Sequence, residues 1–180
     1  MTINDLRIQA QLISSIQIDT STAFKWATDE LLNIVAEYPH AGTYTKEIIT
    51  TTENFEDYVP ERKMLVVDKM IDLGTGRLTT DWDIHGDTIT ISVPGRYEMR
   101  YYSYPDLPKT DAEVIDMQRQ YVDPLKYYLA ARIRARLFGQ NDINAVSFMT
   151  EYTEKMKKAD VITMHKRNRY NRMPPGRRDL

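Results

Sequence analysis

Residues 123–138, DPLKYYLAARIRARLF, decide the fold that the sequence predicts. Asp123 is a residue type that caps helices, Pro124 is favoured at the first helical position, and Gly139 favours a helix end. Four aliphatic residues recur at every fourth position and would share one stripe of a helix: Leu125, Leu129, Ile133 and Leu137. The stretch therefore predicts a core helix over 124–138.

Sequence on both sides of this stretch predicts the rest of one domain, over 1–160. Helical periodicity and capping residues indicate four further helices, at about 4–17, 21–37, 111–121 and 142–157. Residues 44–104 change to short β-branched runs separated by turns, which predicts four or five strands. The clearest hairpin is DWDIHGDTITISV, because Gly86 can adopt the positive φ of a tight turn. We expect an α+β fold, a helical bundle with an inserted small antiparallel β module.

The last twenty residues, 161–180, show no usable period and contain Pro174-Pro175-Gly176, so we expect an extended C-terminal docking arm. Nine of the 24 basic residues but two of the 26 acidic residues follow Glu154. An acidic body with a basic tail predicts that the tail meets a negative surface, either nucleic acid or an acidic protein face. The expected docking residues are Lys166, Arg167, Arg169, Tyr170, Arg172, Pro174, Pro175, Arg177 and Arg178. The tyrosine and prolines favour docking of an extended segment in a groove.

Composition limits the compartment and the covalent chemistry. The 180 residues include no cysteine, which excludes disulfides and thiolate metal sites. No stretch approaches the ~20 apolar residues of a membrane span, and the N-terminus lacks a signal pattern. We therefore expect a soluble protein made in a reducing cytoplasm, with no membrane partner.

No catalytic motif is present. His40, His85 and His165 lie in expected turns or in the tail, without the spacing of a metal site. Gly74-Thr75-Gly76-Arg77 lacks the lysine and hydroxyl of a phosphate loop, and no GxSxG motif occurs. A small enzyme would need a pocket with convergent polar groups, which no pattern indicates. The sequence predicts no catalysis, no metal and no cofactor.

Three arginines of the central helix, Arg132, Arg134 and Arg136, have two interpretations. Arg132 and Arg136 lie one turn apart and would suit the wall of a channel through which duplex DNA passes. Alternatively, the arginines extend over a core helix or pair with acids across a subunit boundary, and this second interpretation is favoured.

Three segments carry a family resemblance: GRYEMRYYSYP at 95–105, PLKYYLAAR at 124–132 and FMTEY at 148–152. Their order resembles the head-to-tail connector proteins of tailed bacteriophages, also called adaptor or head-completion proteins. In that family a strand ends in an aromatic-proline pair, a helix carries a similar aromatic-Leu-Ala-Ala run, and the final helix carries an aromatic residue and a tyrosine.

This resemblance implies a structural virion protein of the phage neck. It implies a ring, usually of twelve copies, between the portal and the tail, with C-terminal segments that reach the portal or neighbouring subunits. The partners would be the portal protein and a tail or next-ring neck protein, and DNA would pass through the channel without sequence-specific binding. Two alternatives stay open: another neck, tail-completion or terminator protein, and a nucleic-acid-binding protein that uses the basic tail. Salt-sensitive affinity of the isolated chain for duplex DNA would favour the latter.

Overall fold

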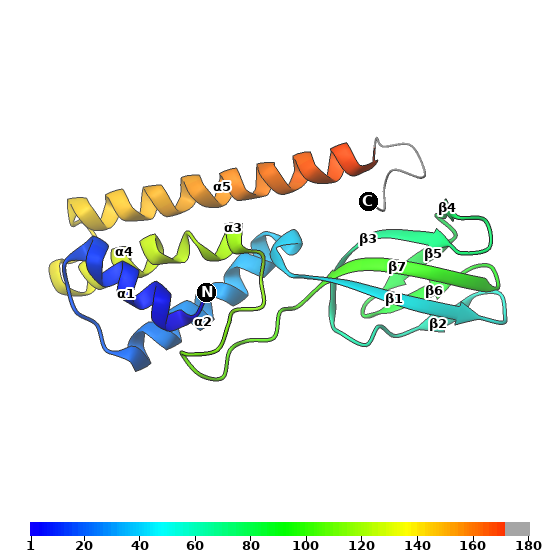
Figure 1. Cartoon of the computed structure of the whole chain (residues 1–180), viewed down its shortest axis with the longest axis horizontal. Helices are drawn as coiled ribbons and strands as arrows, with labels where there is room; N and C mark the ends of the chain where they lie inside the picture. The colour runs from blue at the N-terminus through cyan, green and yellow to red at the C-terminus, as the bar shows by residue number, and fades with distance from the viewer. Residues whose placement is uncertain (172–180) are drawn as a thin grey trace. The chain divides into compact units, whose positions relative to one another are not determined.

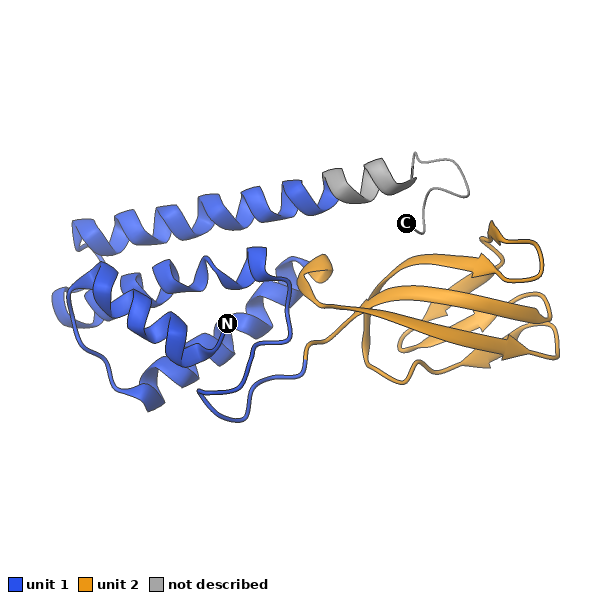
Figure 2. Cartoon of the chain, in the orientation of Figure 1, with its two compact units in different colours: residues 1–38, 106–180 blue, residues 39–105 orange. Residues whose placement is uncertain are grey.

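The computed structural model describes the backbone of residues 1–171 and the side chains of residues 1–164. The chain divides into two compact units (Figure 2). A helical unit combines Met1–Tyr38 with Asp106–Leu180, and a β unit comprises Pro39–Pro105. The helical unit is thus built from two separate parts of the chain, with the β unit between them in sequence.

The helical unit is organised around one central helix (Figure 1). Its elements are α1 (Ile3–Ser14), α2 (Thr20–Glu37), α3 (Arg119–Val122), α4 (Leu125–Phe138) and α5 (Ile143–Asn171). Helix α4 contacts α1, α2 and α5. Its buried residues are Leu125, Tyr128, Leu129, Ala130, Ala131 and Ile133. The predicted core helix is confirmed, although Leu137, expected on the buried stripe, is 59% exposed because α4 ends beside it.

Helix starts in this unit are fixed by local hydrogen bonds. The Asp19 carboxylate accepts from the Thr22 amide at the start of α2, and the Asp142 carboxylate accepts from the Ala145 amide at the start of α5. Asp123 caps nothing: its backbone is helical and its amide donates to Arg119, because α3 runs directly up to the start of α4. The expected cap at Asp123 is therefore wrong.

The predicted helix over 111–121 is also wrong, because α3 covers one turn at its end. The preceding residues run beside the start of α1, where Val114 forms an antiparallel bridge with Thr2. The Ile115 amide donates to the Met1 carbonyl, and the Asn4 amide donates to the Asp111 carbonyl. These backbone groups find partners distant in sequence, so a helix is not needed to satisfy them.

The predicted extended arm over 161–180 is corrected as well. Helix α5 continues to Asn171, and the remaining nine positions lie outside the described residues. The Thr163 side chain is buried, and its hydroxyl accepts hydrogen bonds from Gln120 and Tyr121 of α3. Met156 and Ala159 share this buried face at helical spacing. A stripe of one methionine, one alanine and one threonine is weakly apolar, which explains why periodicity missed it.

The β unit contains two antiparallel sheets, not one small module. The strands are β1 (Thr43–Thr51), β2 (Glu56–Tyr58), β3 (Met64–Asp72), β4 (Arg77–Leu78), β5 (Trp82–His85), β6 (Thr88–Ile91) and β7 (Gly95–Ser103). The strand order is β1-β7-β3-β4 in the first sheet and β2-β6-β5 in the second. The predicted hairpin is confirmed, with His85 opposite Thr88 and φ of 64° at Gly86.

The core of the β unit lies between the sheets. Ile49, Met99 and Tyr101 come from the first sheet, and Ile89 and Ile91 come from the second. The apolar residues of β6 therefore share one core with those of β7, although the two strands belong to different sheets. The expected fold class is therefore wrong. The chain is mixed helix and sheet, but it has two antiparallel sheets where one small module was expected, and a long final helix where an extended arm was expected from residue 161.

Candidate functional site: a basic and aromatic groove in the helical unit

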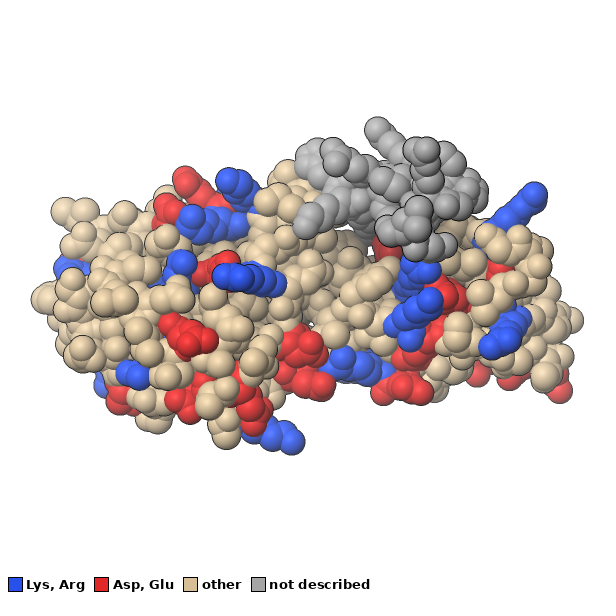
Figure 3. Space-filling view, viewed as in Figure 1, with Lys and Arg blue, Asp and Glu red and all other residues tan. Residues whose placement is uncertain are grey.

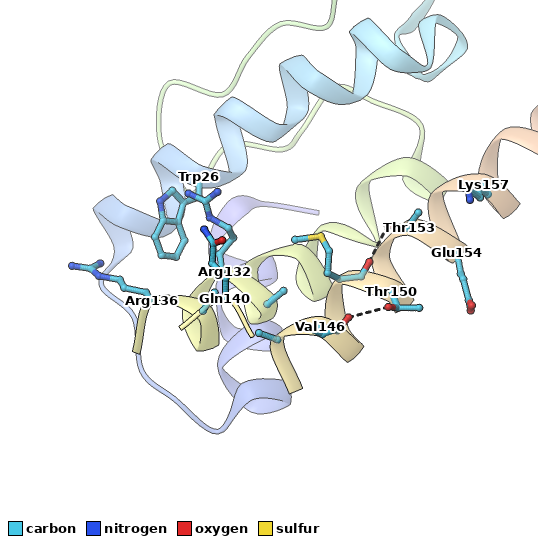
Figure 4. Close-up of a pocket in the computed structure, with 13 residues that line it drawn as sticks. Trp26, Arg132, Arg136, Gln140, Val146, Thr150, Thr153, Glu154 and Lys157 are labelled. Carbon is cyan, nitrogen blue, oxygen red and sulfur yellow. Dashed lines mark hydrogen bonds between the residues drawn. The ribbon is translucent and has the colours of Figure 1, made fainter. Parts of the chain in front are cut away.

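Helices α2, α4 and α5 enclose a groove of about 850 Å³, here called the Trp26 groove (Figure 4). Small and apolar residues form much of its lining: Ala131, Ala135, Ala145, Val146 and Met149. The indole of Trp26 and the side chains of Arg132, Arg136 and Lys157 supply its aromatic and cationic part. The alanines of α4 create the groove because their side chains leave space between the helix backbones.

Trp26 brings the two arginines together. The Arg132 guanidinium carbon lies 5.1 Å from the Trp26 ring centroid, and that of Arg136 lies 6.0 Å from it. Such contacts are favourable because the π face carries negative charge. Within the described part of the chain neither guanidinium forms an ion pair. The groove therefore offers two cations that an anionic partner can bind.

The remaining polar side chains of the groove add little chemistry. The hydroxyls of Thr150 and Thr153 donate to carbonyls one turn earlier in α5, at 3.0 Å each (Figure 4). Glu154 is the single carboxylate among the lining residues, which include no histidine. This composition suits binding of an anionic and apolar segment, and it provides no general base paired with a nucleophile.

Arg134 serves a different purpose from its two neighbours. Its guanidinium donates two hydrogen bonds to the Asp142 carboxylate, from Nε at 2.9 Å and from Nη2 at 3.0 Å. These bonds raise the pKa of Arg134 and lower the pKa of Asp142. Because Asp142 also caps α5, the pair fixes the link between α4 and α5. The sequence grouped the three arginines, and the structure brings Arg132 and Arg136 together while separating Arg134.

Helix α2 also carries a buried carboxylate, which the sequence analysis did not predict. Glu30 of α2 is 9% exposed and accepts hydrogen bonds from the Tyr152 hydroxyl at 2.5 Å and from the Asn33 amide at 3.0 Å. Burial, followed by the bond to Glu30, raises the pKa of Tyr152. Its ring packs on that of Tyr128, with centroids 5.5 Å apart. The available signal was spacing, since Glu30 falls on the buried stripe between Ala27 and Ile34.

The expected docking residues lie mostly beyond what the structure describes. Lys166, Arg167, Arg169 and Tyr170 are in the last turns of α5, where the backbone alone is described. The other five, Arg172, Pro174, Pro175, Arg177 and Arg178, lie outside the described residues.

The histidines form no common site among the described side chains. His40, expected in a solvated loop, is instead buried, with its ring 5.0 Å from that of Tyr102. His85 ends β5, and the side chain of His165 is not described. In the described residues no group of three or more histidines and carboxylates is arranged to hold a metal ion.

The comparisons with known proteins identify no family for this chain. No protein-family model matches the chain, and no curated protein is significantly similar to it. Among the helices described up to Asn171, none has both the length and the apolar character needed to cross a bilayer.

Proposed function

We propose that this chain is a head-to-tail adaptor of a tailed bacteriophage, a structural protein that forms a ring between the portal and the tail. The main observation in support of this proposal is that each unit has its own core and still presents large apolar side chains to solvent. Ile143 is 84% exposed in the helical unit, and Phe55 is 72% exposed in the β unit. Where such side chains gather into one contiguous patch, they are typical of assembly interfaces.

The segments that resemble the adaptor family lie in structurally central elements. Residues 95–105 contain β7, which pairs with both β1 and β3. Residues 124–132 begin α4, which contacts three other helices, and residues 148–152 lie in α5. A resemblance that falls in core elements supports membership of the family more than one on the surface would, because core residues set how the elements pack.

One end of the helical unit provides a candidate contact surface. Four apolar residues there are more than half exposed: Leu137, Phe138, Ile143 and Val146. On the face viewed in Figure 3, this end, near the link between α4 and α5, is largely free of charged side chains. Burial of exposed apolar area stabilises association by roughly 25 cal/mol per Å² before ordering costs. This end therefore supports subunit or portal contacts.

The proposed mechanism is mechanical and needs no catalysis. Twelve copies joined head to tail would close a ring, because a heterologous contact repeated by rotation closes when the rotation divides a full turn. The basic C-terminal residues would bind the portal, and repetition around the ring would multiply a modest affinity per copy. DNA would pass through the centre of the ring without sequence-specific contacts.

The test is assembly on the portal of the same virus. Purified chain is mixed with portal rings, and co-sedimentation and electron microscopy measure binding and stoichiometry. Removal of residues 172–180 tests the tail and leaves the buried Thr163 in place. Removal from 161 onward would also take Thr163 away from α3 and damage the helical unit. The adaptor role would be refuted if the full chain did not bind portal rings and bound duplex DNA with a strong dependence on salt concentration.

A further inference from the structure

The Trp26 groove calls for an occupant that is acidic and carries an apolar anchor. The cations Arg132, Arg136 and Lys157 outnumber the one carboxylate, Glu154, in its lining. The same lining includes an aromatic wall and a floor of alanines, a valine and a methionine. Interface anchors are typically aromatic side chains that fill such a pocket, surrounded by complementary charge.

The β unit of the same chain contains a segment with this chemistry. Residues 52–59, TENFEDYV, carry three carboxylates and no basic residue. The phenyl ring of Phe55 stands at the centre of the segment and is 72% exposed. Glu53 and Asp57 flank it and are exposed as well. The segment lies at a sheet edge, because β2 is the outer strand of its sheet.

Residues 52–57, here called the Phe55 loop, hold this anchor in a defined and unfavourable backbone conformation. Phe55 has φ of 57°, in the left-handed region that bulky residues avoid. The Glu56 carboxylate fixes the loop by accepting from the Thr52 amide at 2.7 Å and the Glu53 amide at 3.2 Å. Glycine would fit this φ without strain. A phenylalanine that strains its backbone and exposes its ring serves neither the fold nor the core, which indicates an external contact.

We propose that the Phe55 loop of one copy binds the Trp26 groove of a second copy, with Phe55 on the apolar floor and Glu53 and Asp57 near Arg132 and Arg136. The contact joins two different surfaces, so it repeats from copy to copy and suits closure of a ring. This inference rests on the proposed function, for which it names the contact between neighbouring subunits.

The first test compares full-length variants by sedimentation velocity over a concentration series. Phe55→Gly removes the phenyl group and relieves the strained φ, so self-association should weaken at least tenfold. The thermal midpoint should rise when both chains are compared at a concentration at which they are monomeric, because association itself stabilises the native state. Leu78→Ser, which removes another exposed apolar side chain of the β unit, should associate like wild type. A lower midpoint together with lost association would assign Phe55 to the fold and overturn the proposal.

The groove is tested by charge reversal at matched net charge. The double variant Arg132→Glu with Arg136→Glu should also associate at least tenfold more weakly than wild type. Lys25→Glu with Lys158→Glu changes the net charge equally at exposed positions outside the groove lining, and should have a smaller effect. Equal loss in both double variants would mean that net charge alone drives association, and would overturn the proposed contact.

Mixing distinguishes a contact between copies from one within a chain. Phe55→Gly retains the groove, and the groove variant retains the loop, so the mixture should form a one-to-one complex that does not grow further. No complex in the mixture, or a wild-type chain that stays monomeric at about 1 mM, would overturn the proposal.

The same variants separate this inference from the adaptor role. Normal rings of Phe55→Gly on the portal would refute the contact and leave the adaptor role intact. Conversely, if wild-type chains associate through the Phe55 loop and the Trp26 groove but do not bind the portal, the adaptor role is refuted and the proposed contact still holds.

Discussion

Replacement of Tyr152 by phenylalanine should destabilise the helical unit by removing a hydrogen bond to a buried charge. The Tyr152 hydroxyl donates to Glu30 at 2.5 Å, and Glu30 is 9% exposed. A hydrogen bond to a charged group is worth about 1.5–3 kcal/mol. After the substitution the Glu30 carboxylate would still interact with the Asn33 amide and the Tyr128 hydroxyl. With a urea slope of about 2 kcal/mol/M, the midpoint should fall by about 1 M.

The assay must report on the helical unit alone. The chain has two tryptophans, Trp26 in the helical unit and Trp82 in the β unit. In a Trp82→Phe background, intrinsic fluorescence therefore follows the surroundings of Trp26. Urea titrations at pH 7 then compare Tyr152→Phe with its parent, and near-ultraviolet circular dichroism checks that the native packing is kept.

Tyr127→Phe is the matched control, because it removes a hydroxyl from a half-buried tyrosine whose ring contacts Lys126 and Lys155. Its effect should be below about 0.5 kcal/mol. A Glu30→Gln background should reduce the effect of Tyr152→Phe to about 0.5–1.5 kcal/mol, since a neutral acceptor forms a weaker bond. Equal midpoints for Tyr152→Phe and Tyr127→Phe would refute the reasoning.

Three other predictions concern the core, a close backbone approach and an ion pair. Leu129→Ala at the centre of α4 should cost about 2–5 kcal/mol in urea unfolding, whereas Leu137→Ala, at the exposed end, should change stability by less than about 0.5 kcal/mol. Gly42→Ala would place a Cβ 2.3 Å from the Ser103 carbonyl oxygen, so its thermal midpoint should fall well below that of Gly74→Ala, whose Cβ would meet the Asp72 side chain at 3.2 Å. Asp142→Asn tests pH dependence: Arg134 lowers the folded pKa of Asp142, so the stability contribution of the charged pair is present above pH about 4 and is lost as pH falls through the folded pKa. The gap between the unfolding midpoints of wild type and Asp142→Asn should therefore narrow at acidic pH, and a gap that stays constant from pH 7 to pH 2 would contradict this.

Sequence alone determined the features that depend on a few neighbouring residues. The α4 helix follows from its apolar stripe, and the turn at Gly86 follows from a residue that tolerates positive φ between two β-branched runs. The change from helical to β structure near residue 43 is likewise visible in the period of the sequence. In each case the hydrogen bonds or the buried face lie within one element, so local pattern is sufficient.

Tertiary structure decided everything that needed a distant partner. The residues before α3 bond to the start of α1 instead of forming a helix, and Thr163 extends α5 because Gln120 and Tyr121 contact it. Division of the strands into two sheets depends on which strands pair, and burial of Glu30 depends on Tyr152, 122 residues later in the chain. The Trp26 groove likewise exists because three helices meet there. Such contacts close long loops, and their free energy depends on surfaces that come together after local structure has formed.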